Sequence, residues 1–234
     1  MLWLGQFGIA DGQAQEETPW VGVFPDETRG PEASDLLLIV QPATAESVEF
    51  CAELKEAVGS VFHKSKVSLT GGLLRALREA HENLREWNRK SLREHWIAAG
   101  ISCAAVRGNE VYLAQVAPAG ATFYRHHETQ PIRPQLADAL EPLGMFDEFW
   151  PEFSLFEMED GDRLLLMTPG LAQSLPRDGL GASLALPADE VLPAVYRQAS
   201  ALPDCGAVLI AALSEAEEPS ATLIADELLT RQLP

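Results

Sequence analysis

Carboxylates beside apolar runs are the residues of this sequence with the clearest chemical potential. Glu157, Asp160 and Asp162 lie in an acidic turn before the apolar run 164–167, and Asp204 precedes a second run at 207–213. Carboxylate oxygens are the ligands that Mg²⁺ and Mn²⁺ prefer, so such residues could hold a cation that activates water. A solvated turn explains the 157–162 cluster without chemistry, and it is the simpler interpretation.

The histidines and one serine resemble parts of known sites but lack partners. His81 and His95 lie on or near a predicted helix with no carboxylate or second histidine at ligand spacing, so we interpret them as structural. Adjacent side chains in an extended 126–128 segment (His-His-Glu) would point to opposite faces, which favours a solvated loop. The segment 100–104, with Ser102, weakly resembles a nucleophile elbow, but it opens a hairpin rather than a strand-turn-helix unit, which excludes that interpretation.

Prolines end two of the predicted strands. The run 164–167 fits a strand buried on both faces, and Pro169 stops it because proline has no N–H to donate to a sheet. The run 36–40 is the first clear strand, and Gln41-Pro42 ends it. In a metal-dependent hydrolase the end of a buried strand would present a carboxylate. These strand ends present an amide and prolines.

Two helices and a set of strands are predicted to position these strand ends. Thr44 can cap a helix that reaches residue 62 and turns Val48 inward, and a longer helix at 73–91 has an apolar stripe that includes Trp87. The runs 101–106 and 111–116 predict a hairpin, and a third strand returns to form a meander. That third strand is expected at 121–125.

The remaining segments complete a single predicted domain, 1–234. Residues 1–35 are rich in turn formers, and residues 130–153, with four prolines, are interpreted as connecting structure. The later elements are a hairpin of 153–158 with 164–167, a helix at 188–201, a last strand at 207–213 and an acidic C-terminal extension at 214–234.

Composition limits the partners and the compartment. With 17 Lys and Arg against 35 Asp and Glu, the formal net charge is −18, and this disfavours nucleic acid and anionic membranes. No apolar stretch reaches the length of about 20 residues that spans a bilayer, and the N-terminus lacks the pattern of a signal peptide. Three separated cysteines in apolar surroundings predict reduced thiols and a cytoplasmic protein: Cys51, Cys103 and Cys205.

The order of the elements predicts an α+β fold in which two mostly antiparallel sheets pack face to face with helices outside. Five local sequences, in the same order, resemble the metal-dependent (PPM, type 2C) protein serine/threonine phosphatase family: 36–42, 73–100, 112–125, 161–171 and 203–210. The resemblance covers about residues 8 to 213 and implies a four-layer α-β-β-α sandwich.

The family resemblance also implies a binuclear Mn or Mg site at one end of the sandwich. In this alignment Gln41 stands where the first bridging aspartate is expected, Pro118 replaces the acid of the hairpin, and Pro169 replaces the acid of a Ser-Asp-Gly triplet. Asp204 matches the closing acidic position. Nearer the N-terminus, Gln15 and 18–20 (Thr-Pro-Trp) correspond to the phosphate-binding arginine and an Asn-Glu-Asp segment, while Asp11-Gly12 mimics the metal-binding dipeptide ahead of the first clear strand.

Two functions follow from these substitutions. One carboxylate and an amide cannot hold two cations that each need several oxygen ligands, so we predict a pseudophosphatase that needs no cofactor and binds a protein partner or a phosphoprotein. The alternative is an active phosphatase with a rearranged or reduced Mn or Mg site built from four candidates: Asp204, Glu157, Asp160 and Asp162. An unrelated hydrolase is a third interpretation, for which the sequence has no elbow, phosphate loop or zinc motif.

Overall fold

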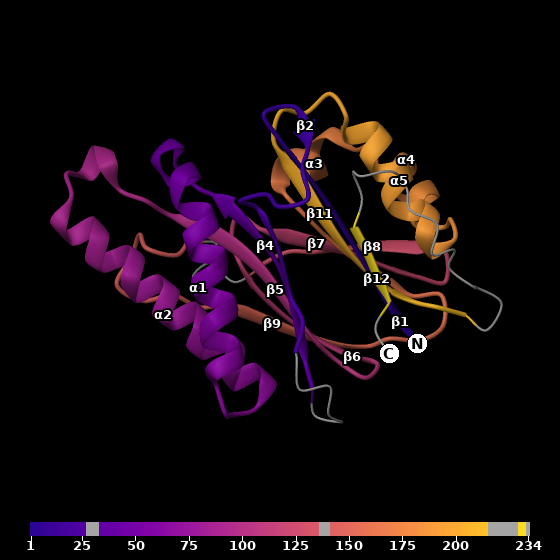
Figure 1. Cartoon of the computed structure of the whole chain (residues 1–234), viewed down its shortest axis with the longest axis horizontal. Helices are drawn as coiled ribbons and strands as arrows, with labels where there is room; N and C mark the ends of the chain where they lie inside the picture. The colour runs from indigo at the N-terminus through magenta and orange to yellow at the C-terminus, as the bar shows by residue number, and fades with distance from the viewer. Residues whose placement is uncertain (27–32, 136–140, 215–228, 233–234) are drawn as a thin grey trace.

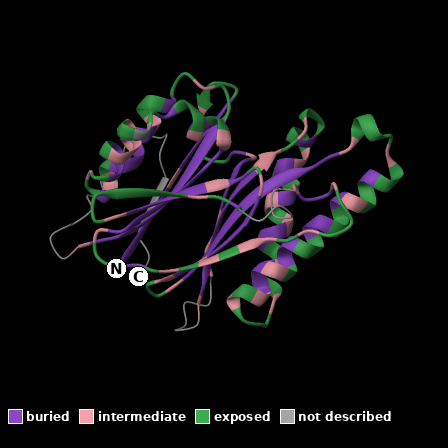
Figure 2. Ribbon diagram, turned by 180° about the vertical axis from the view of Figure 1, so that it is seen from behind, coloured by how far each residue is buried: buried purple, intermediate pink, exposed green. Residues whose placement is uncertain are grey.

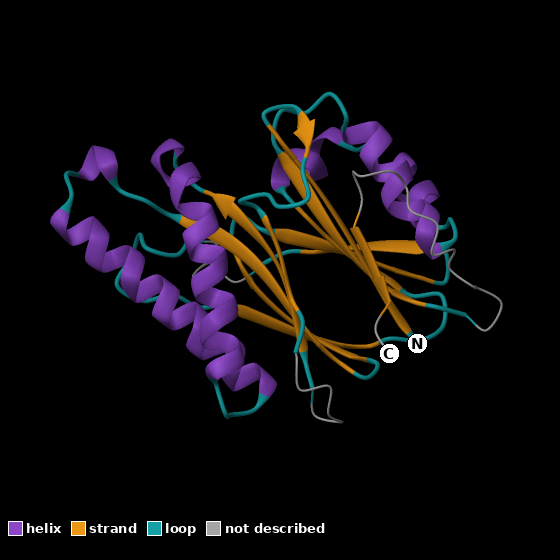
Figure 3. Ribbon diagram, in the orientation of Figure 1, coloured by secondary structure: helices purple, strands orange, loops and turns teal. Residues whose placement is uncertain are grey.

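Two antiparallel sheets lie face to face in the computed structural model, which describes residues 1–26, 33–135, 141–214 and 229–232. One sheet has the order β12-β1-β11-β10-β7-β8, with β2 paired to β1, and the other has the order β3-β4-β5-β6-β9. Helices α1 and α2 cover the outside of the second sheet, and α3 to α5 cover the outside of the first (Figures 1 and 3). The predicted α+β sandwich of four layers is confirmed.

The bounds of the strands are as follows. The first sheet contains β1 (Leu2–Ala10), β2 (Gln13–Ala14), β7 (Gly120–Arg125), β8 (Glu128–Ile132), β10 (Arg163–Met167), β11 (Cys205–Ala212) and β12 (Leu229–Gln232). The second contains β3 (Val21–Phe24), β4 (Asp35–Pro42), β5 (Ala99–Arg107), β6 (Glu110–Val116) and β9 (Glu152–Glu157). The helices are α1 (Cys51–Lys64), α2 (Leu69–Lys90), α3 (Pro169–Ser174), α4 (Arg177–Leu184) and α5 (Ala188–Ala199), with short 3₁₀ turns at η1 (Ala45–Phe50) and η2 (Arg93–His95).

Burial on both faces of the central strands explains their continuous apolar runs. In β10, Leu164 and Leu166 belong to the core between the sheets, whereas Leu165 and Met167 belong to a second core under α3 to α5. Successive side chains of a strand point to opposite faces, so a strand covered on both sides needs apolar residues at every position. Figure 2 shows the buried residues concentrated along these strands. The predicted two-sided burial of 164–167 is confirmed.

The helices on the second sheet differ from the prediction in detail. The helix expected from residue 44 begins as the 3₁₀ turn η1, and Thr44 makes no capping bond. Instead Thr44 Oγ1 lies 2.6 Å from Ser47 Oγ and donates to the carbonyl of Trp96 at 3.1 Å. Val48 and Trp87, both predicted to face inward, are 42% and 49% exposed. Val48 lies in the 3₁₀ turn η1, which does not follow the α-helical period, and Trp87, near the end of α2, packs edge-on against Phe50 with ring centroids 5.0 Å apart.

Two of the predicted strand pairings are wrong. The β5–β6 hairpin is confirmed, but β7 leaves that sheet and pairs with β8 and β10, so there is no meander. The expected hairpin of 153–158 with 164–167 is also absent, because β9 pairs with β6 while β10 pairs with β7 and β11. Short connections carry the chain from one sheet to the other, and Phe123 meets Phe156 across the interface with ring centroids 4.7 Å apart.

Several elements were not predicted at all. The N-terminal segment, interpreted as turn-rich, contains β1, which pairs with β11 in the first sheet. Its glycines lower strand propensity, but Gly5 is packed against Trp3 and Leu192, where a Cβ would lie 2.6 Å from each side chain. Strand β8 overlaps the start of 130–153, and α3 and α4 follow β10. The strand at 207–213 is not the last, since β12 pairs with β1; residues 215–228 and 233–234 of the expected extension lie outside the described residues.

None of the helices in the described ranges combines the length and the apolar character that crossing a membrane requires.

Candidate functional site at the strand ends

Four of the residues singled out in the sequence gather at one end of the sandwich. Gln41 lies opposite Gly100 in the β4–β5 pairing, and a Cβ on Gly100 would lie 2.3 Å from Cδ of Pro118. Met167, at the end of β10, lies opposite Gly120 at the start of β7 and opposite Ala207 near the start of β11. Pro169 directly follows β10 and Asp204 directly precedes β11. The candidate positions therefore lie at the same end of the two sheets. We call this place, defined by Gln41, Pro118, Pro169 and Asp204, the strand-end edge.

Three of these residues, Gln41, Pro118 and Pro169, together have a single side-chain oxygen that could coordinate a metal ion. Gln41 is half-buried, and its Nε2 donates to the neighbouring carbonyl of Pro42 at 3.4 Å. Pro118 is exposed and follows Ala117 through a cis peptide bond, and Pro169 occupies the first turn of α3. Proline side chains have no atom that can coordinate a cation. The amide of Gln41 is thus the sole ligand that these three side chains supply.

Asp204 is the carboxylate at this edge, and it is engaged with the N-terminal segment. Its Oδ1 accepts from the backbone N–H of Asp11 at 3.2 Å, and the N–H of Gly12 donates to the carbonyl of Pro203 at 2.8 Å. Asp11 has a φ of 53°, so a tight turn after β1 brings it to the start of β11. From the sequence, Asp11-Gly12 lies ahead of the first predicted strand and is not expected at the site, because the sequence does not predict β1. The structure brings it beside Asp204.

Thr168, the polar residue after β10, is hydrogen-bonded to the backbone of β11. The Thr168 N–H donates to the carbonyl of Gly206 at 3.0 Å, and the Thr168 hydroxyl accepts from the N–H of Gly206 at 3.2 Å. Thr168 is only 4% exposed. Its oxygen therefore fixes β10 to β11 and is not directed to a ligand.

The N-terminal candidates are packed beneath the same edge. Thr18 lies against Gly8, where a Cβ would come 2.5 Å from the Thr18 hydroxyl oxygen. The indole N–H of Trp20 donates to the carbonyl of Ile9 at 3.1 Å, and Nε2 of Gln15 donates to the carbonyl of Ala10 at 3.3 Å. These contacts hold the segment after β1 against the sheet.

The acidic turn lies at the opposite end of β10 and contributes nothing to the strand-end site. The N–H of Gly161 donates to the carbonyl of Ala212, at the end of β11 that is far from Asp204. Asp162 is 2% exposed, and both of its oxygens accept from Nε of Arg125, at 2.9 and 3.1 Å. Hydrogen bonding to Asp162 raises the pKa of Arg125. This aspartate closes a structural turn.

The other acids of that turn do not approach Asp204 either. Glu157 and Asp160 are exposed. The carbonyl of Glu157 accepts from Arg125 Nη2 at 2.7 Å, so its backbone belongs to the same structural network. The structure therefore does not bring Asp204 together with Glu157, Asp160 or Asp162.

The histidines and the serine have the structural roles that were predicted. His81 is buried, stacks on Phe149 with ring centroids 4.7 Å apart and accepts from the N–H of Gly144 at 3.2 Å. Burial, followed by the charge of Arg85, lowers the pKa of His81. Ser102 is fully buried within β5.

The surface histidines join no group of three or more potential metal ligands among the residues that the structure describes. His126 and His127 have φ values of 52° and 66°, so they form a tight exposed turn and not the extended segment assumed from the sequence. His127 Nδ1 lies 3.1 Å from the Tyr124 hydroxyl. His95 is exposed beside Glu94.

The strand-end residues do not fit a pair of divalent cations. Within the described ranges, no group of three or more His, Cys, Asp or Glu side chains is arranged to hold a metal ion. Two hard cations need several oxygen ligands each, and carboxylates are the usual source. Asp204 and the Gln41 amide fall well short of that number.

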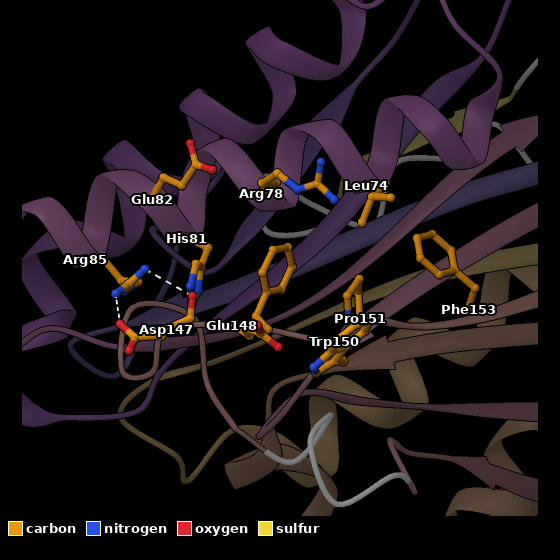
Figure 4. Close-up of a pocket in the computed structure, with 11 residues that line it drawn as sticks. Leu74, Arg78, His81, Glu82, Arg85, Asp147, Glu148, Trp150, Pro151 and Phe153 are labelled. Atoms are coloured by element: carbon orange, nitrogen blue, oxygen red, sulfur yellow. Dashed lines mark hydrogen bonds and ion pairs between the residues drawn. The ribbon is translucent and has the colours of Figure 1, made fainter.

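A hollow that was not anticipated from the sequence lies between α2 and the segment 147–153. It has a volume of about 460 Å³ and is lined by Arg78, His81 and Arg85 of α2 and by Trp150 and Phe153 of the other segment; Figure 4 shows Arg85 directed toward Asp147. Arg85 forms an ion pair with Asp147 and donates from Nη1 to the Asp147 carbonyl at 3.1 Å. Trp150 comes from a proline-rich stretch that is interpreted from the sequence as connecting structure, and Phe153 begins the predicted strand 153–158, so no sequence pattern indicates a hollow here.

No known family profile matches the sequence, and no curated protein matches it. Solved structures do match. A serine/threonine phosphatase from S. agalactiae has a TM-score of 0.71 at 13% identity, covering 92% of this chain and 100% of that one. Stp1 from Staphylococcus aureus has a TM-score of 0.71 at 15% identity, with 92% and 96% of the two chains covered. The catalytic domain of the phosphatase PstP, in complex with two manganese ions, has a TM-score of 0.63 at 16% identity, with 90% and 98% covered.

The chain therefore has the fold of bacterial PPM-type serine/threonine phosphatases over nearly its whole length, which confirms the resemblance at the level of fold.

Proposed function

We propose that this chain is a phosphatase-fold domain that has lost the two-cation site and acts by binding a protein partner, as a regulatory module. The observation that carries the proposal is the combination of Gln41, Pro118 and Pro169 at the edge where β4, β7, β10 and β11 meet. Each of the three would have to be an oxygen-rich side chain for two cations to be held there. Fold and activity are separable, so a phosphatase fold without its ligands can serve another role.

The partner in this proposal is a protein or a phosphoprotein, and neither nucleic acid nor a membrane. A net charge of −18 supports the exclusion of polyanions. One solved neighbour is described as PppA, a key regulatory component of the type VI secretion system of Pseudomonas aeruginosa. The three buried, unpaired thiols support a reducing, cytoplasmic location.

The second candidate is an active phosphatase with a reduced Mn or Mg site. The contact between Asp11 and Asp204 favours it, because it brings two aspartates to the strand-end edge. A single cation bound there would still need most of its ligands from water, so its affinity would be low.

One experiment separates the two candidates. Manganese binding is measured by calorimetry on the full chain, and turnover of p-nitrophenyl phosphate is measured over the same manganese range. The binding module predicts no binding heat and no turnover. Micromolar manganese binding with turnover that Asp204→Ala abolishes would establish the enzyme instead.

A further inference from the structure

Strand β9 (Glu152–Glu157) forms one edge of the five-stranded sheet. It pairs with β6 on one side, and no strand of the described ranges pairs with its other side. The chain at Gln135 approaches its beginning, where the Gln135 N–H donates to the side chain of Glu152 at 2.6 Å. The middle of the strand runs from Phe153 to Phe156.

The N–H and C=O groups of β9 point alternately toward β6 and away from it, and two contacts show which residues point which way. The N–H of Met158 donates to the carbonyl of Asn109 at 2.8 Å, on the β6 side. The carbonyl of Glu157 accepts from Arg125 at 2.7 Å, on the opposite side. In an antiparallel pair this direction alternates residue by residue, so the N–H and C=O groups of Phe153 and Leu155 point outward, away from β6.

The same two residues carry exposed apolar side chains. Phe153 is 39% exposed and Leu155 is 53% exposed, whereas Phe156 turns inward onto Phe123. Edge strands are usually protected against pairing with another chain by a proline, a lysine or a short length. Strand β8 has Pro131 and exposed polar residues, and β3 has only four residues. Strand β9 has neither proline nor lysine and displays apolar residues at its centre.

Two hollows continue the edge at both ends of the strand. The hollow of about 460 Å³ beside α2 is lined by Phe153 and Trp150 at the start of β9. A second hollow of about 330 Å³ is lined by Phe123, Leu155 and Phe156 toward its end. Unpaired backbone groups flanked by side-chain pockets are the features that an added strand uses, since the backbone supplies affinity and the pockets supply specificity.

Charge indicates what kind of chain would pair with this edge. The hollows are lined by three cations, Arg78, Arg85 and Arg125, and by five carboxylates, Glu82, Asp147, Glu148, Glu157 and Glu159. Arg85 and Arg125 already form ion pairs within the chain. A second copy would bring another net charge of −18 and a second set of glutamates to the same edge. The balance favours a different chain that carries Lys or Arg.

We propose that the outer edge of β9 is the docking site for an extended segment of a partner protein, with apolar residues at alternate positions and basic residues between or beside them. The segment pairs with the outward backbone groups of Phe153 and Leu155 and places side chains in the two hollows. This names the partner surface for the regulatory module proposed above, but the edge is separate from the strand-end site. Variants of Leu155 leave the manganese result unchanged, so the two proposals fail independently.

The test uses a phage-displayed library of random peptides, selected on the full chain and depleted on its Leu155→Lys variant. Peptides that survive are synthesised, and their affinities are measured by fluorescence polarisation. The proposal expects sequences with alternating apolar residues and Lys or Arg. It expects Leu155→Pro to weaken their binding by about tenfold or more, because proline removes the outward N–H while the β6 pairing of an edge strand tolerates it.

Two further variants and one measurement complete the test. Leu155→Thr keeps the N–H and the strand propensity, and the proposal expects a smaller loss from it than from Leu155→Pro; Leu92→Thr, at a residue 67% exposed elsewhere, should change nothing. Circular dichroism confirms that each variant is folded. Amide exchange on the wild-type chain should slow at Phe153 and Leu155 when peptide binds.

Three outcomes would overturn the proposal. The first is a selection that yields no peptide with micromolar affinity. The second is a bound peptide that leaves the amides of Phe153 and Leu155 unprotected. The third is sedimentation that shows a concentration-dependent dimer that Leu155→Lys abolishes, which would assign the edge to a second copy of this chain.

Discussion

The two ends of β10 differ in how many carboxylates they carry and in what those carboxylates do. At one end, Asp162 sits in a turn rich in carboxylates, and it is buried and bound to Arg125. At the other end, Thr168 and Pro169 follow β10, and Asp204 precedes β11 at the strand-end edge, where the family resemblance predicts the cations. The end with many carboxylates uses them to fix the chain, and the end where carboxylates would do chemistry has almost none.

This difference shows that the position of an acidic residue matters more than its abundance. Asp162 accepts from Arg125 and also from the N–H of Glu159 at 2.7 Å, so its oxygens are satisfied before any ligand arrives. Its role is to close the connection that carries the chain from β9 in one sheet to β10 in the other. The predictions that follow test whether the acidic end is structural and whether the strand-end edge lacks only its ligands.

The largest effect is expected from Asp162→Asn. The substitution removes a charge that pairs with Arg125 and accepts several hydrogen bonds while buried, which should cost about 3 kcal/mol of the free energy of unfolding. This value lies at the low end of the range for a buried ion pair, because the Arg125 side chain is 32% exposed. In the variant, solvent can therefore partly replace the lost carboxylate as the partner of Arg125. Urea unfolding followed by circular dichroism measures the loss.

The matched control for that substitution is Asp160→Asn, two residues earlier and exposed. It should change the free energy of unfolding by less than about 0.5 kcal/mol, as surface substitutions usually do. Equal effects of the two variants would mean that the Arg125–Asp162 pair contributes no more than an ordinary surface ion pair.

Gly100→Ala should have the next largest effect and tests the opposite end. A Cβ at residue 100 would lie 2.3 Å from both Cδ and N of Pro118, and backbone atoms cannot move aside as a flexible side chain can. Overpacking of this kind costs about 2 kcal/mol. Urea unfolding measures it.

Gly170→Ala is the control at the same edge, because nothing lies within 4 Å of its Cβ position. It lies inside α3, where alanine is favoured over glycine by about 0.5 to 1 kcal/mol, so a small gain in stability is expected. Should Gly100→Ala be as stable as the wild type, the strand-end edge would be loosely packed and open to rearrangement around a ligand.

These stability predictions depend on contacts that only partly follow from the sequence. The run 164–167 was predicted as a doubly buried strand because four consecutive apolar residues leave no polar face. The pairing of 153–158 with 164–167 was wrong because alternation identifies a strand but not the sheet it joins. Strand β1 was missed because Gly5 and Gly8 hide its pattern, and their close contacts with Trp3 and Thr18 form only in the fold.

The candidate site was predictable in one respect and not in another. Gln41, Pro118, Pro169 and Asp204 each flank a predicted strand, and the structure brings them to one edge. Their correspondence to the ligands of the phosphatase family stays a prediction. The contact between Asp11 and Asp204 joins residues 193 apart in the chain, and no local pattern indicates such a meeting.

The third prediction concerns a variant in which two carboxylates are introduced at the strand-end edge. The double variant Gln41→Asp with Pro169→Asp should bind manganese at least about tenfold more tightly than the wild type, because it places two additional carboxylates near Asp204. An aspartate at residue 169 also suits the first turn of α3, where negative charge is favourable. Calorimetric titration with MnCl₂ measures the affinity.

The control for charge alone is Asn109→Asp with Thr129→Asp, two exposed positions toward the opposite end of the sandwich. It adds the same number of carboxylates and should leave manganese affinity unchanged. If both double variants gained equally, the gain would come from net charge and not from a site.

The smallest effect concerns Cys205, which directly follows Asp204 at the strand-end edge. Burial, with a further contribution from the charge of Asp204, raises the pKa of this thiol to about 11. At pH 8 the thiolate is therefore scarce, and labelling by a disulfide reagent should be slow in the folded chain. Asp204→Asn removes the smaller of the two causes, so the labelling rate should rise by only about twofold to threefold.

Cys51 is the internal reference for this measurement, because burial alone raises its pKa to about 12. Its labelling rate, followed by mass spectrometry of the digested chain, should not respond to Asp204→Asn. A larger change at Cys205 that Cys51 shares would report local or global opening of the fold. A change confined to Cys205 would show that the charge of Asp204 acts on this thiol, and manganese should then mimic the substitution only in the Gln41→Asp and Pro169→Asp double variant.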